Sequence, residues 1–215
     1  MQIPKNWTFN NSNVVANFDK HVIEQLPWYP LATNMVAHLV RAYLPENGTL
    51  IDFGCSTGNI TRVTSDTILA RKAKAISIDN SQEMAKAFKG VGELVIDDME
   101  SYKTPKFDVA ICFLSIMFMR VNSRKKFISS LMNNCKTGGV IIVVDKFQLF
   151  DGYLGTAISR LTLSNKIASG CSCEDIVKKE LSISGVQRPM KTDDLKYFTK
   201  WLQVGEFAGY IFEKT

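Results

Sequence analysis

The stretch that decides the fold is Leu50-Ile51-Asp52-Phe53-Gly54-Cys55-Ser56-Thr57-Gly58. It begins as a short apolar run with one acidic residue and then breaks into a turn that holds two glycines. A segment compatible with a helix follows from about Asn59. A strand, a tight glycine loop and a helix start are the parts from which an α/β sheet builds a nucleotide pocket.

Strand and helix patterns alternate along the chain after this stretch. Apolar runs at 75–78, 94–96, 109–113 and 140–144 predict four further strands. Residues 197–213 are aromatic and β-branched, which predicts a strand pair that closes the sheet. Together with the opening strand, these predict an α/β fold with a doubly wound, mostly parallel, seven-stranded sheet.

Two helices of this region are predicted with their ends. One spans 59–69, directly after the glycine loop, and the other spans 124–135. Lys136-Thr137-Gly138-Gly139 follows the second helix, and glycine just past a helix end is typical of a C-terminal cap.

Residues 1–48 precede the glycine loop and are predicted to form a helical lid over the pocket. Apolar residues recur at helical spacing over 14–26, with Ser12 or Asn13 as the N-cap, and again over 31–43. Helices that only pack against the core are the alternative.

Residues 49–215 are predicted to form the ligand-binding α/β domain, so that the chain is one structural domain overall. Over 148–191 the periodicity weakens and glycines interrupt it. A segment inserted there is expected to cap the carboxyl ends of the strands, where α/β sheets bind ligands.

Composition narrows the class of protein. The chain has 215 residues, of which 46% are hydrophobic and 22% are charged, as in ordinary globular domains. No apolar run is long enough to span a bilayer and the N-terminus shows no signal core, so we expect a cytoplasmic protein without a membrane partner. Five scattered cysteines and two histidines predict no metal site, although Cys171 and Cys173 leave a redox or metal feature open.

The glycine loop excludes two classes of nucleotide. A dinucleotide site has the spacing G-x-G-x-x-G, but Ser56 stands where the middle glycine is needed. A P-loop needs Gly-Lys-Ser/Thr, which is absent. A ligand with ribose and adenine but no phosphate remains, and S-adenosylmethionine fits this description.

Three acidic residues at successive strand ends support that ligand. Asp52 lies in the opening stretch, Asp79 ends the next predicted strand and Asp98 follows the third. Asp79 can accept hydrogen bonds from the ribose hydroxyls, Asp98 can accept one from the adenine amino group, and the amides of 54–56 can face the methionine end. A single Asp in such a place is often a helix cap or turn former instead.

Further motifs extend the pattern over nearly the whole chain. They are Trp7-Thr8-Phe9, Val15-Ala16 with Phe18-Asp19, Pro27-Trp28-Tyr29, Ile78-Asp79-Asn80-Ser81 with Met84, Asp145-Lys146-Phe147, and Trp201-Leu202-Gln203 with Phe207. On these residues the chain is similar to the class I S-adenosylmethionine-dependent methyltransferases, which have a Rossmann-like fold. Within that class it resembles the carboxy-S-adenosyl-L-methionine synthases of the tRNA wobble-uridine pathway.

The resemblance implies a pocket for S-adenosylmethionine or its carboxylated derivative. The residues expected to bind this cofactor are Tyr29, Asp52, Gly54, Cys55, Ser56, Gly58, Asp79, Asn80, Asp98, Met99 and Cys112.

Two positions depart from the synthases. Cys112 stands where they have an asparagine, and Lys179 is the nearest match to the arginine that holds the added carboxylate. A lysine can pair with a carboxylate as a point charge but lacks the planar bidentate contact of arginine.

The chemistry expected is transfer of a methyl group from S-adenosylmethionine to an unidentified acceptor. The catalytic candidates are Tyr29 and Asp145 as general base and Lys179 as the residue that faces the substrate, with structural roles as the alternative. Carboxylation of the cofactor with prephenate and non-catalytic binding of the cofactor by a regulatory protein are the other two functions that we consider.

The nature of the acceptor stays open between a small molecule and RNA. The net charge of +5 permits a nucleic-acid partner, and Lys178, Lys179, Arg188 and Lys191 are candidates to contact RNA beside the cleft. The same residues also suit an exposed face or a clamp for an anionic substrate. A homodimer is compatible with the resemblance.

Overall fold

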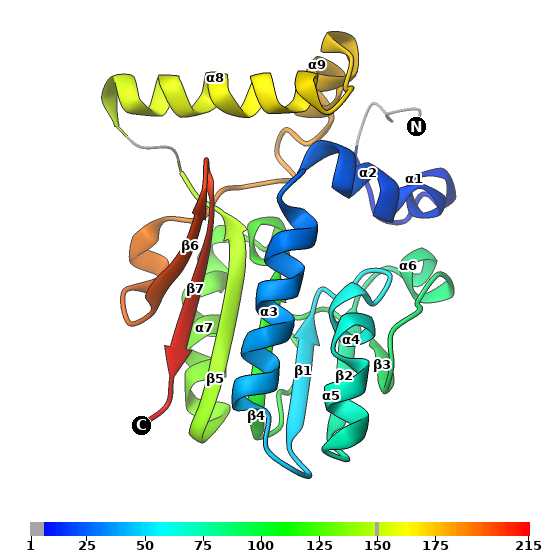
Figure 1. The fold of residues 1–215 in the computed structure, drawn as a ribbon, viewed down its shortest axis with the longest axis vertical. Helices are drawn as coiled ribbons and strands as arrows, with labels where there is room; N and C mark the ends of the chain where they lie inside the picture. Colours follow the sequence, from blue (N-terminus) through cyan, green and yellow to red (C-terminus); the bar gives the residue numbers. More distant parts are fainter. Residues whose placement is uncertain (1–6, 149–150) are drawn as a thin grey trace.

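The computed structural model describes residues 7–148 and 151–215. Its centre is a seven-stranded sheet with the order β3-β2-β1-β4-β5-β7-β6 (Figure 1). The first five strands in the chain run parallel, and β7 runs antiparallel to both β5 and β6. The strands are β1 (Thr49–Phe53), β2 (Lys74–Asp79), β3 (Glu93–Ile96), β4 (Phe107–Phe113), β5 (Cys135–Lys146), β6 (Thr199–Val204) and β7 (Phe207–Glu213).

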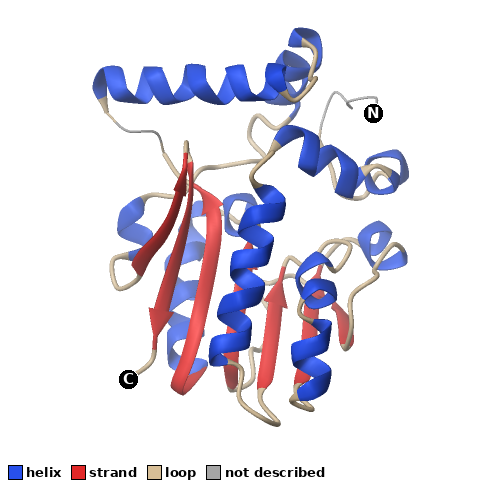
Figure 2. Cartoon of the chain, in the orientation of Figure 1, coloured by secondary structure: helices blue, strands red, loops and turns tan. Residues whose placement is uncertain are grey.

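Helices cover both faces of the sheet (Figure 2). They are α1 (Ser12–Ala16), α2 (Phe18–Gln25), α3 (Tyr29–Tyr43), α4 (Asn59–Val63), α5 (Ser65–Ala70), α6 (Gln82–Lys86), α7 (Val121–Asn134), α8 (Gly152–Ala168) and α9 (Cys173–Ser182), with short 3₁₀ helices η1 (Ile116–Phe118) and η2 (Thr192–Leu195). The doubly wound α/β fold expected from the sequence is therefore confirmed.

Alternation along the strands divides the core into two layers. In β1, Ile51 and Phe53 pack on the α7 side with Phe127, whereas Leu50 packs on the opposite side with Val36 of α3. Successive side chains of a strand point to opposite faces, so a strand that is buried on both faces is apolar at nearly every position. This two-sided burial fixes the sheet and thereby the positions of the strand ends.

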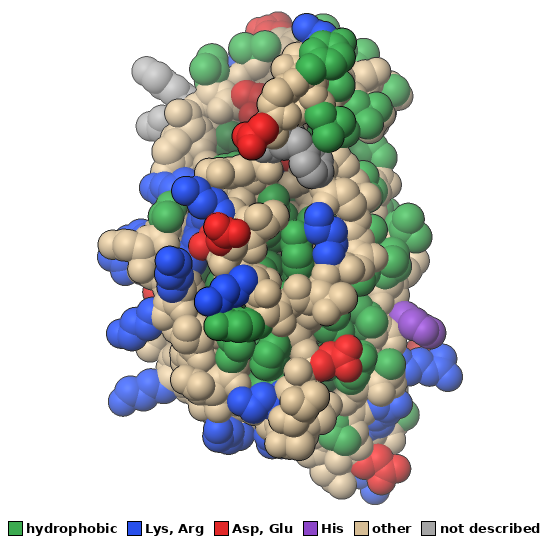
Figure 3. All heavy atoms as spheres, turned by 90° about the vertical axis from the view of Figure 1, so that its left-hand side faces the viewer, with side chains coloured by type: hydrophobic (Ala, Val, Ile, Leu, Met, Phe, Trp, Pro, Cys, Tyr) green, Lys and Arg blue, Asp and Glu red, His purple; other side chains and the backbone are tan. Residues whose placement is uncertain are grey.

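The helices α8 and α9 lie beyond the carboxyl ends of the strands, across the top of Figure 1. Gly155 and Lys166 are the residues of α8 that are buried, and an added Cβ at Gly205 would come within 3.3 Å of Thr162 Oγ1. The outward side of α8 carries exposed Tyr153 and Leu161, and Figure 3 shows hydrophobic side chains exposed at this upper end of the molecule.

One helix boundary differs from the prediction. Helix α7 ends at Asn134, and the glycines at 138 and 139 belong to β5 instead of a helix cap. The backbone N–H of Gly138 donates to Lys214 O at 2.7 Å, and a Cβ at Gly139 would lie 2.7 Å from Asp108 O. The glycines therefore permit a close backbone approach where the β4–β5 register shifts.

Two predicted helices are each divided in the structure. The first helix of the lid is interrupted at Asn17, and its N-cap is Asn11, whose side chain accepts from the N–H groups of residues 13 and 14. The helix predicted over 59–69 is interrupted at Thr64, whose hydroxyl donates to Ile60 O at 2.7 Å. A side chain that bonds the preceding turn competes with the helical backbone and often bends the helix.

Candidate functional site

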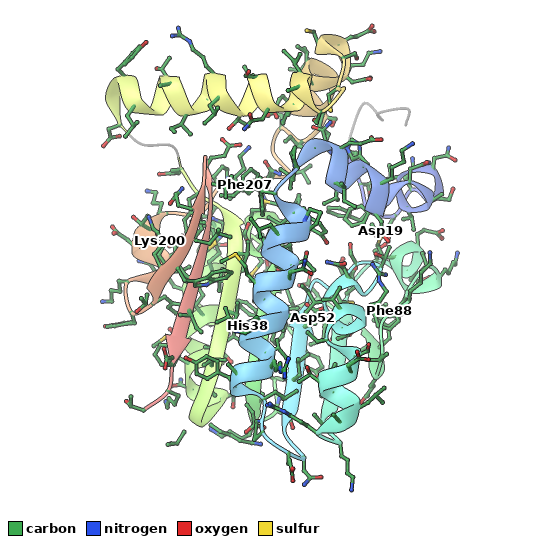
Figure 4. All side chains as sticks on the ribbon, viewed as in Figure 1. Asp19, His38, Asp52, Phe88, Lys200 and Phe207 are labelled. Atoms are coloured by element: carbon green, nitrogen blue, oxygen red, sulfur yellow. The ribbon has the colours of Figure 1, made fainter. Side chains whose placement is uncertain are left out.

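A cavity of about 250 Å³ opens at the carboxyl ends of the strands. Its wall contains residues from the ends of β1, β2, β4 and β5, from the β6–β7 turn, from α2 and from α8 and α9. Figure 4 shows Asp19 of α2 and Phe207 of β7 on opposite sides of the upper end of α3, at this level of the molecule. Ligands of doubly wound sheets bind in such a crevice.

The glycine loop is held by the backbone of β2. The N–H groups of Gly54 and Cys55 both donate to Ile78 O, at 2.8 and 3.0 Å. Gly54 and Ser56 have φ values of 73° and 53°, in the left-handed region. A Cβ at Gly54 would lie 2.5 Å from Ser115 Cβ, so this position accepts only glycine without movement of the neighbouring loop.

Asp79 ties the glycine loop to the start of α6. One carboxylate oxygen accepts from Ser56 N at 2.8 Å and the other accepts from Ser81 N at 2.9 Å. Burial raises the pKa of Asp79, while the two N–H donors act against this rise. Each oxygen keeps a lone pair, so the carboxylate can bind a ligand hydroxyl in addition to holding the loop.

Asp52 is a buried acid with an unused oxygen. Its side chain is 1% exposed, it lines the cavity, and its Oδ2 receives no hydrogen bond from the described chain. Burial, with a further contribution from Asp79, raises the pKa of Asp52 to about 8. A buried acceptor without a partner is costly, so this atom is suited to a donor that arrives with a ligand.

The opposite end of the cavity is more open. Asp98 is exposed and its Oδ1 accepts from Glu100 N at 2.8 Å, while Asn80 and Met99 line the same wall. The fold therefore places Asp52, Asp79 and Asp98 along one wall of the cavity, with Asp52 at the buried end and Asp98 at the exposed end.

Three predicted site residues lie outside the cavity wall. Gly58 is the N-cap of α4 with φ 83°, and Cys112 is fully buried in β4. Asp145 is fully buried as well, and its carboxylate accepts from the N–H groups of Ile116, Met117 and Lys146 at 2.8, 3.2 and 2.8 Å. Burial raises the pKa of Asp145 to about 7, against the effect of these donors. The interpretation of Asp145 as an accessible base is therefore corrected, because this side chain holds the loop after β4.

Tyr29 lines the cavity, as predicted from the sequence. Its ring packs edge-on against Phe113, with centroids 5.2 Å apart. Burial, with the nearby Asp19 and Asp52, raises the pKa of the Tyr29 hydroxyl. At neutral pH the hydroxyl keeps its proton, which makes it a hydrogen-bond donor to a ligand and not a base.

Lys179 reaches the cavity from the cap. Its ammonium lies over the Trp7 ring, and Trp7 also stacks on His21 with centroids 5.7 Å apart. Burial, with a further contribution from Lys166, lowers the pKa of Lys179 to about 6. Burial, and then Lys179, lowers the pKa of His21 to about 4. Lys166 itself pairs with Glu180 at 2.8 Å.

A second ion pair was not predicted from the sequence. Lys146 Nζ lies 2.9 Å from Glu206 Oε1 and 3.1 Å from Gln187 Oε1, and all three residues line the cavity. Asp145-Lys146-Phe147 was noted as a motif, but nothing in the sequence connects Lys146 with Glu206, which lies 60 positions later. Only the pairing of β5 with β7 brings them together.

Two of the residues considered for RNA, Lys178 and Lys179, do not share one face. Lys178 pairs with Glu174 on the outside of α9 at 2.6 Å, whereas Lys179 faces the cavity. Within residues 7–148 and 151–215, no group of three His, Cys, Asp or Glu side chains is placed to hold a metal ion. In the same part of the chain, the helices are too short or too polar to cross a membrane.

The chain is similar to methyltransferases in part of its sequence and in its fold. Residues 50–139 match the model of a family described as a methyltransferase domain. Human N-acetylserotonin methyltransferase, solved in complex with SAM, superposes on 96% of this chain and 58% of its own at 12% identity, with a TM-score of 0.59. The fold is that of a class I methyltransferase. A magnesium protoporphyrin IX methyltransferase from Synechocystis, solved with bound SAH, superposes with a TM-score of 0.53 at 16% identity, over 85% of this chain and 80% of its own.

Curated relatives of this methyltransferase-fold chain share a more specific name. The carboxy-S-adenosyl-L-methionine synthase of Staphylococcus epidermidis is 25% identical over 97% of both chains. The synthase of Wolinella succinogenes is 28% identical over 87% of this chain and 81% of its own. The resemblance indicated by the sequence motifs is thus confirmed.

Proposed function

We propose that this chain binds S-adenosylmethionine in the cavity and transfers its methyl group to an acceptor. The observation that carries the proposal is the glycine loop bound to Asp79 beside Asp52, whose buried Oδ2 has no hydrogen-bond partner among the described residues. A cationic ammonium, such as that of the methionine moiety, supplies the missing donor. The bound ligand of the two superposed methyltransferases supports the same assignment.

The order of the strands supports one orientation of the cofactor. Asp98 follows β3, Asp79 ends β2, and Asp52 with the glycine loop ends β1. Adenine, ribose and the methionine end would therefore bind in this order along the edge of the sheet. The transferable methyl group would then face the ends of β4 and β5 and the start of β7.

The chain contributes orientation and exclusion of water. The sulfonium of S-adenosylmethionine is an activated electrophile, so the acceptor needs to be held in line with the methyl carbon. The cap and Tyr29 enclose the cavity, and Tyr29 can donate a hydrogen bond to an acceptor or to the cofactor.

Mass spectrometry of the ligand released from purified protein tests the proposal. We expect the released ligand to be S-adenosylmethionine or its demethylated product. We also expect added S-adenosylmethionine with a deuterated methyl group to replace it in the protein. Recovery of a different nucleotide would contradict the proposal. Turnover with an acceptor would also exclude the alternative of a protein that binds the cofactor without catalysis.

A second function, synthesis of carboxy-S-adenosylmethionine from prephenate, is supported by the names of the relatives and by Lys179. In the cavity this lysine has no carboxylate within ion-pairing distance in the described chain, and its ammonium rests on Trp7. An added carboxylate would give Lys179 an ionic partner and raise its pKa. Such a pair would be monodentate, because lysine lacks the fork of arginine.

Mass analysis after incubation with S-adenosylmethionine and prephenate decides between the two functions. Carboxylated cofactor that forms with the wild type and with Lys178→Met, but not with Lys179→Met, would establish the second function. If the wild type binds S-adenosylmethionine but forms no carboxylated cofactor, methyl transfer remains the proposed function.

A further inference from the structure

Lys146 and Glu206 form an ion pair in the cavity wall, on the side away from the glycine loop. Their side chains are 12% and 11% exposed, and their charged atoms are 2.9 Å apart. The Lys146 ammonium also lies 5.9 Å from the centre of the Phe207 ring. A buried ion pair seldom stabilises a fold more than apolar side chains of the same volume, so structure alone gives little reason for it here.

The backbone holds both residues in fixed positions. Lys146 ends β5 opposite Phe207, the first residue of β7, so Glu206 directly precedes this register pair. Phe147 N donates to Glu206 O at 2.8 Å, and Met190 N donates to Lys146 O at 2.8 Å. Charged groups are placed more accurately where hydrogen bonds hold the backbone around them.

The strand order sets the pair on the acceptor side of the cavity. The acids expected to bind the cofactor follow β3, β2 and β1, and β4, β5 and β7 come next in the sheet. Among the charged cavity residues of the described chain, Lys146 and Glu206 are the two that come from the end of β5 and the β6–β7 turn. A group bound beside them would approach the cofactor from the side of the sulfonium.

The other acidic and phenolic candidates do not fill this position. Asp145 is fully buried under three N–H donors, and Tyr29 keeps its proton at neutral pH. Glu206 is the cavity carboxylate that comes from the β6–β7 turn, whereas Glu180 of α9, which also lines the cavity, pairs with Lys166 at 2.8 Å.

We propose that Glu206 is the catalytic base for an acceptor with an N–H or O–H nucleophile and that Lys146 is the residue that positions it. This inference rests on the proposed function. The nucleophile forms a bond to the methyl carbon, and the carbon–sulfur bond breaks with its electron pair moving to sulfur. The proton of the nucleophile passes to the Glu206 carboxylate. The sulfonium thereby loses its positive charge and the carboxylate loses its negative charge, so the charges balance. Apart from the acceptor, S-adenosylmethionine is the only reactant that this step needs.

The test needs no knowledge of the acceptor. Sinefungin carries an amine where S-adenosylmethionine carries its transferable methyl group, whereas S-adenosylhomocysteine has neither. The ratio of the two dissociation constants therefore reports the charge that faces the methyl position. In Glu206→Gln we expect the preference for sinefungin over S-adenosylhomocysteine to fall about tenfold, with affinity for S-adenosylhomocysteine within threefold of wild type.

Two further variants make the result specific. Lys146→Gln leaves the Glu206 carboxylate without its cation, so at pH 8 the preference for sinefungin should rise at least threefold. Misfolding would lower the affinity for both ligands. It could not lower the preference for sinefungin in one variant and raise it in the other. Glu100→Gln removes a carboxylate from the same cavity near Asp98, where its partner is Arg120, and should leave the ratio unchanged.

The outcomes separate this inference from the proposed function. If S-adenosylhomocysteine binds the wild type and the ratio is the same in Glu206→Gln, Lys146→Gln and wild type, Glu206 does not face the methyl position and the inference is overturned. If neither ligand binds the wild type, the proposed function fails and this inference falls with it.

Discussion

The two sides of the cavity are built in different ways. The strand wall, which comprises 54–56 and the acids Asp52, Asp79 and Asp98, is fixed by backbone hydrogen bonds between neighbouring strands and loops. The cap wall, which comprises Trp7, His21, Lys166, Lys179 and Glu180, is held by ring stacking, by one ion pair between α8 and α9, and by a backbone hydrogen bond from Trp7 N to Ser182 O at 3.0 Å. We therefore expect the strand wall to bind the cofactor and the cap wall to contact the acceptor.

Replacement of Asp79 should produce the largest change. Asp79→Ala removes two hydrogen bonds to the glycine loop and the proposed contact with ribose. We expect S-adenosylhomocysteine to bind at least roughly 100-fold more weakly, because a charge-assisted hydrogen bond contributes about 1.5–3 kcal/mol. Calorimetric titration measures this, with Asp193→Ala, an exposed Asp on η2, as the matched control. Equal affinity in both variants would show that the strand wall does not bind the cofactor.

Two glycines compare the strand wall with the segment that follows α9. Gly54 and Gly185 have nearly the same φ, 73° and 74°, but a Cβ at Gly185 meets no atom of the described chain within 4 Å, whereas one at Gly54 meets Ser115. Gly185→Ala should cost about 1–2 kcal/mol of the free energy of unfolding, from backbone strain alone. Gly54→Ala should cost about 1–3 kcal/mol more, because overpacking is added.

Urea unfolding gives both values. If the two variants lose the same amount, the loop around Ser115 moves freely, and the strand wall is no more rigid than the segment that follows α9.

The two walls should also respond to pH in opposite directions. Asp52 has a raised pKa of about 8, so the folded state holds a proton that the unfolded state has lost, and stability falls as the pH rises from 6 to 8. Lys179 has a lowered pKa of about 6, so the unfolded state holds the extra proton, and stability rises over the same interval. In the wild type the two effects oppose each other.

Two substitutions should separate them. Relative to wild type, the free energy of unfolding of Asp52→Asn should rise with pH between 6 and 8, and that of Lys179→Met should fall, each by about 1 kcal/mol per pH unit. Urea unfolding at pH 6, 7 and 8 measures the slopes. Identical slopes in all three proteins would mean that neither group titrates as described.

The strand wall was predictable because its signals are local. The glycine spacing, the acid after each strand and the apolar runs all lie within short windows, and the structure brings the three acids to one wall. The same local reasoning failed at Lys136-Thr137-Gly138-Gly139, where glycines typical of a helix cap instead permit two strands to approach. Sheet pairing over long range determined that outcome.

The remaining part of the site depends on contacts that no window of sequence contains. Glu206 meets Lys146 only through β7, and Lys179 meets Trp7 across most of the chain. Asp145 lies at the end of a strand, where site residues are expected, yet its carboxylate is buried and accepts hydrogen bonds from the backbone of the loop after β4. Burial and partners of this kind follow from tertiary packing, which is why the pairing of Lys146 with Glu206 and the burial of Asp145 were not predicted.

The central claim is that the cavity binds S-adenosylmethionine. Calorimetric titration of wild-type protein with S-adenosylhomocysteine, after removal of any co-purified ligand, tests it most directly. We expect saturable binding to one site per chain, with a dissociation constant below roughly 1 mM, the upper end of the usual range for enzyme substrates. No detectable binding at that concentration by protein that is shown to be folded would contradict it.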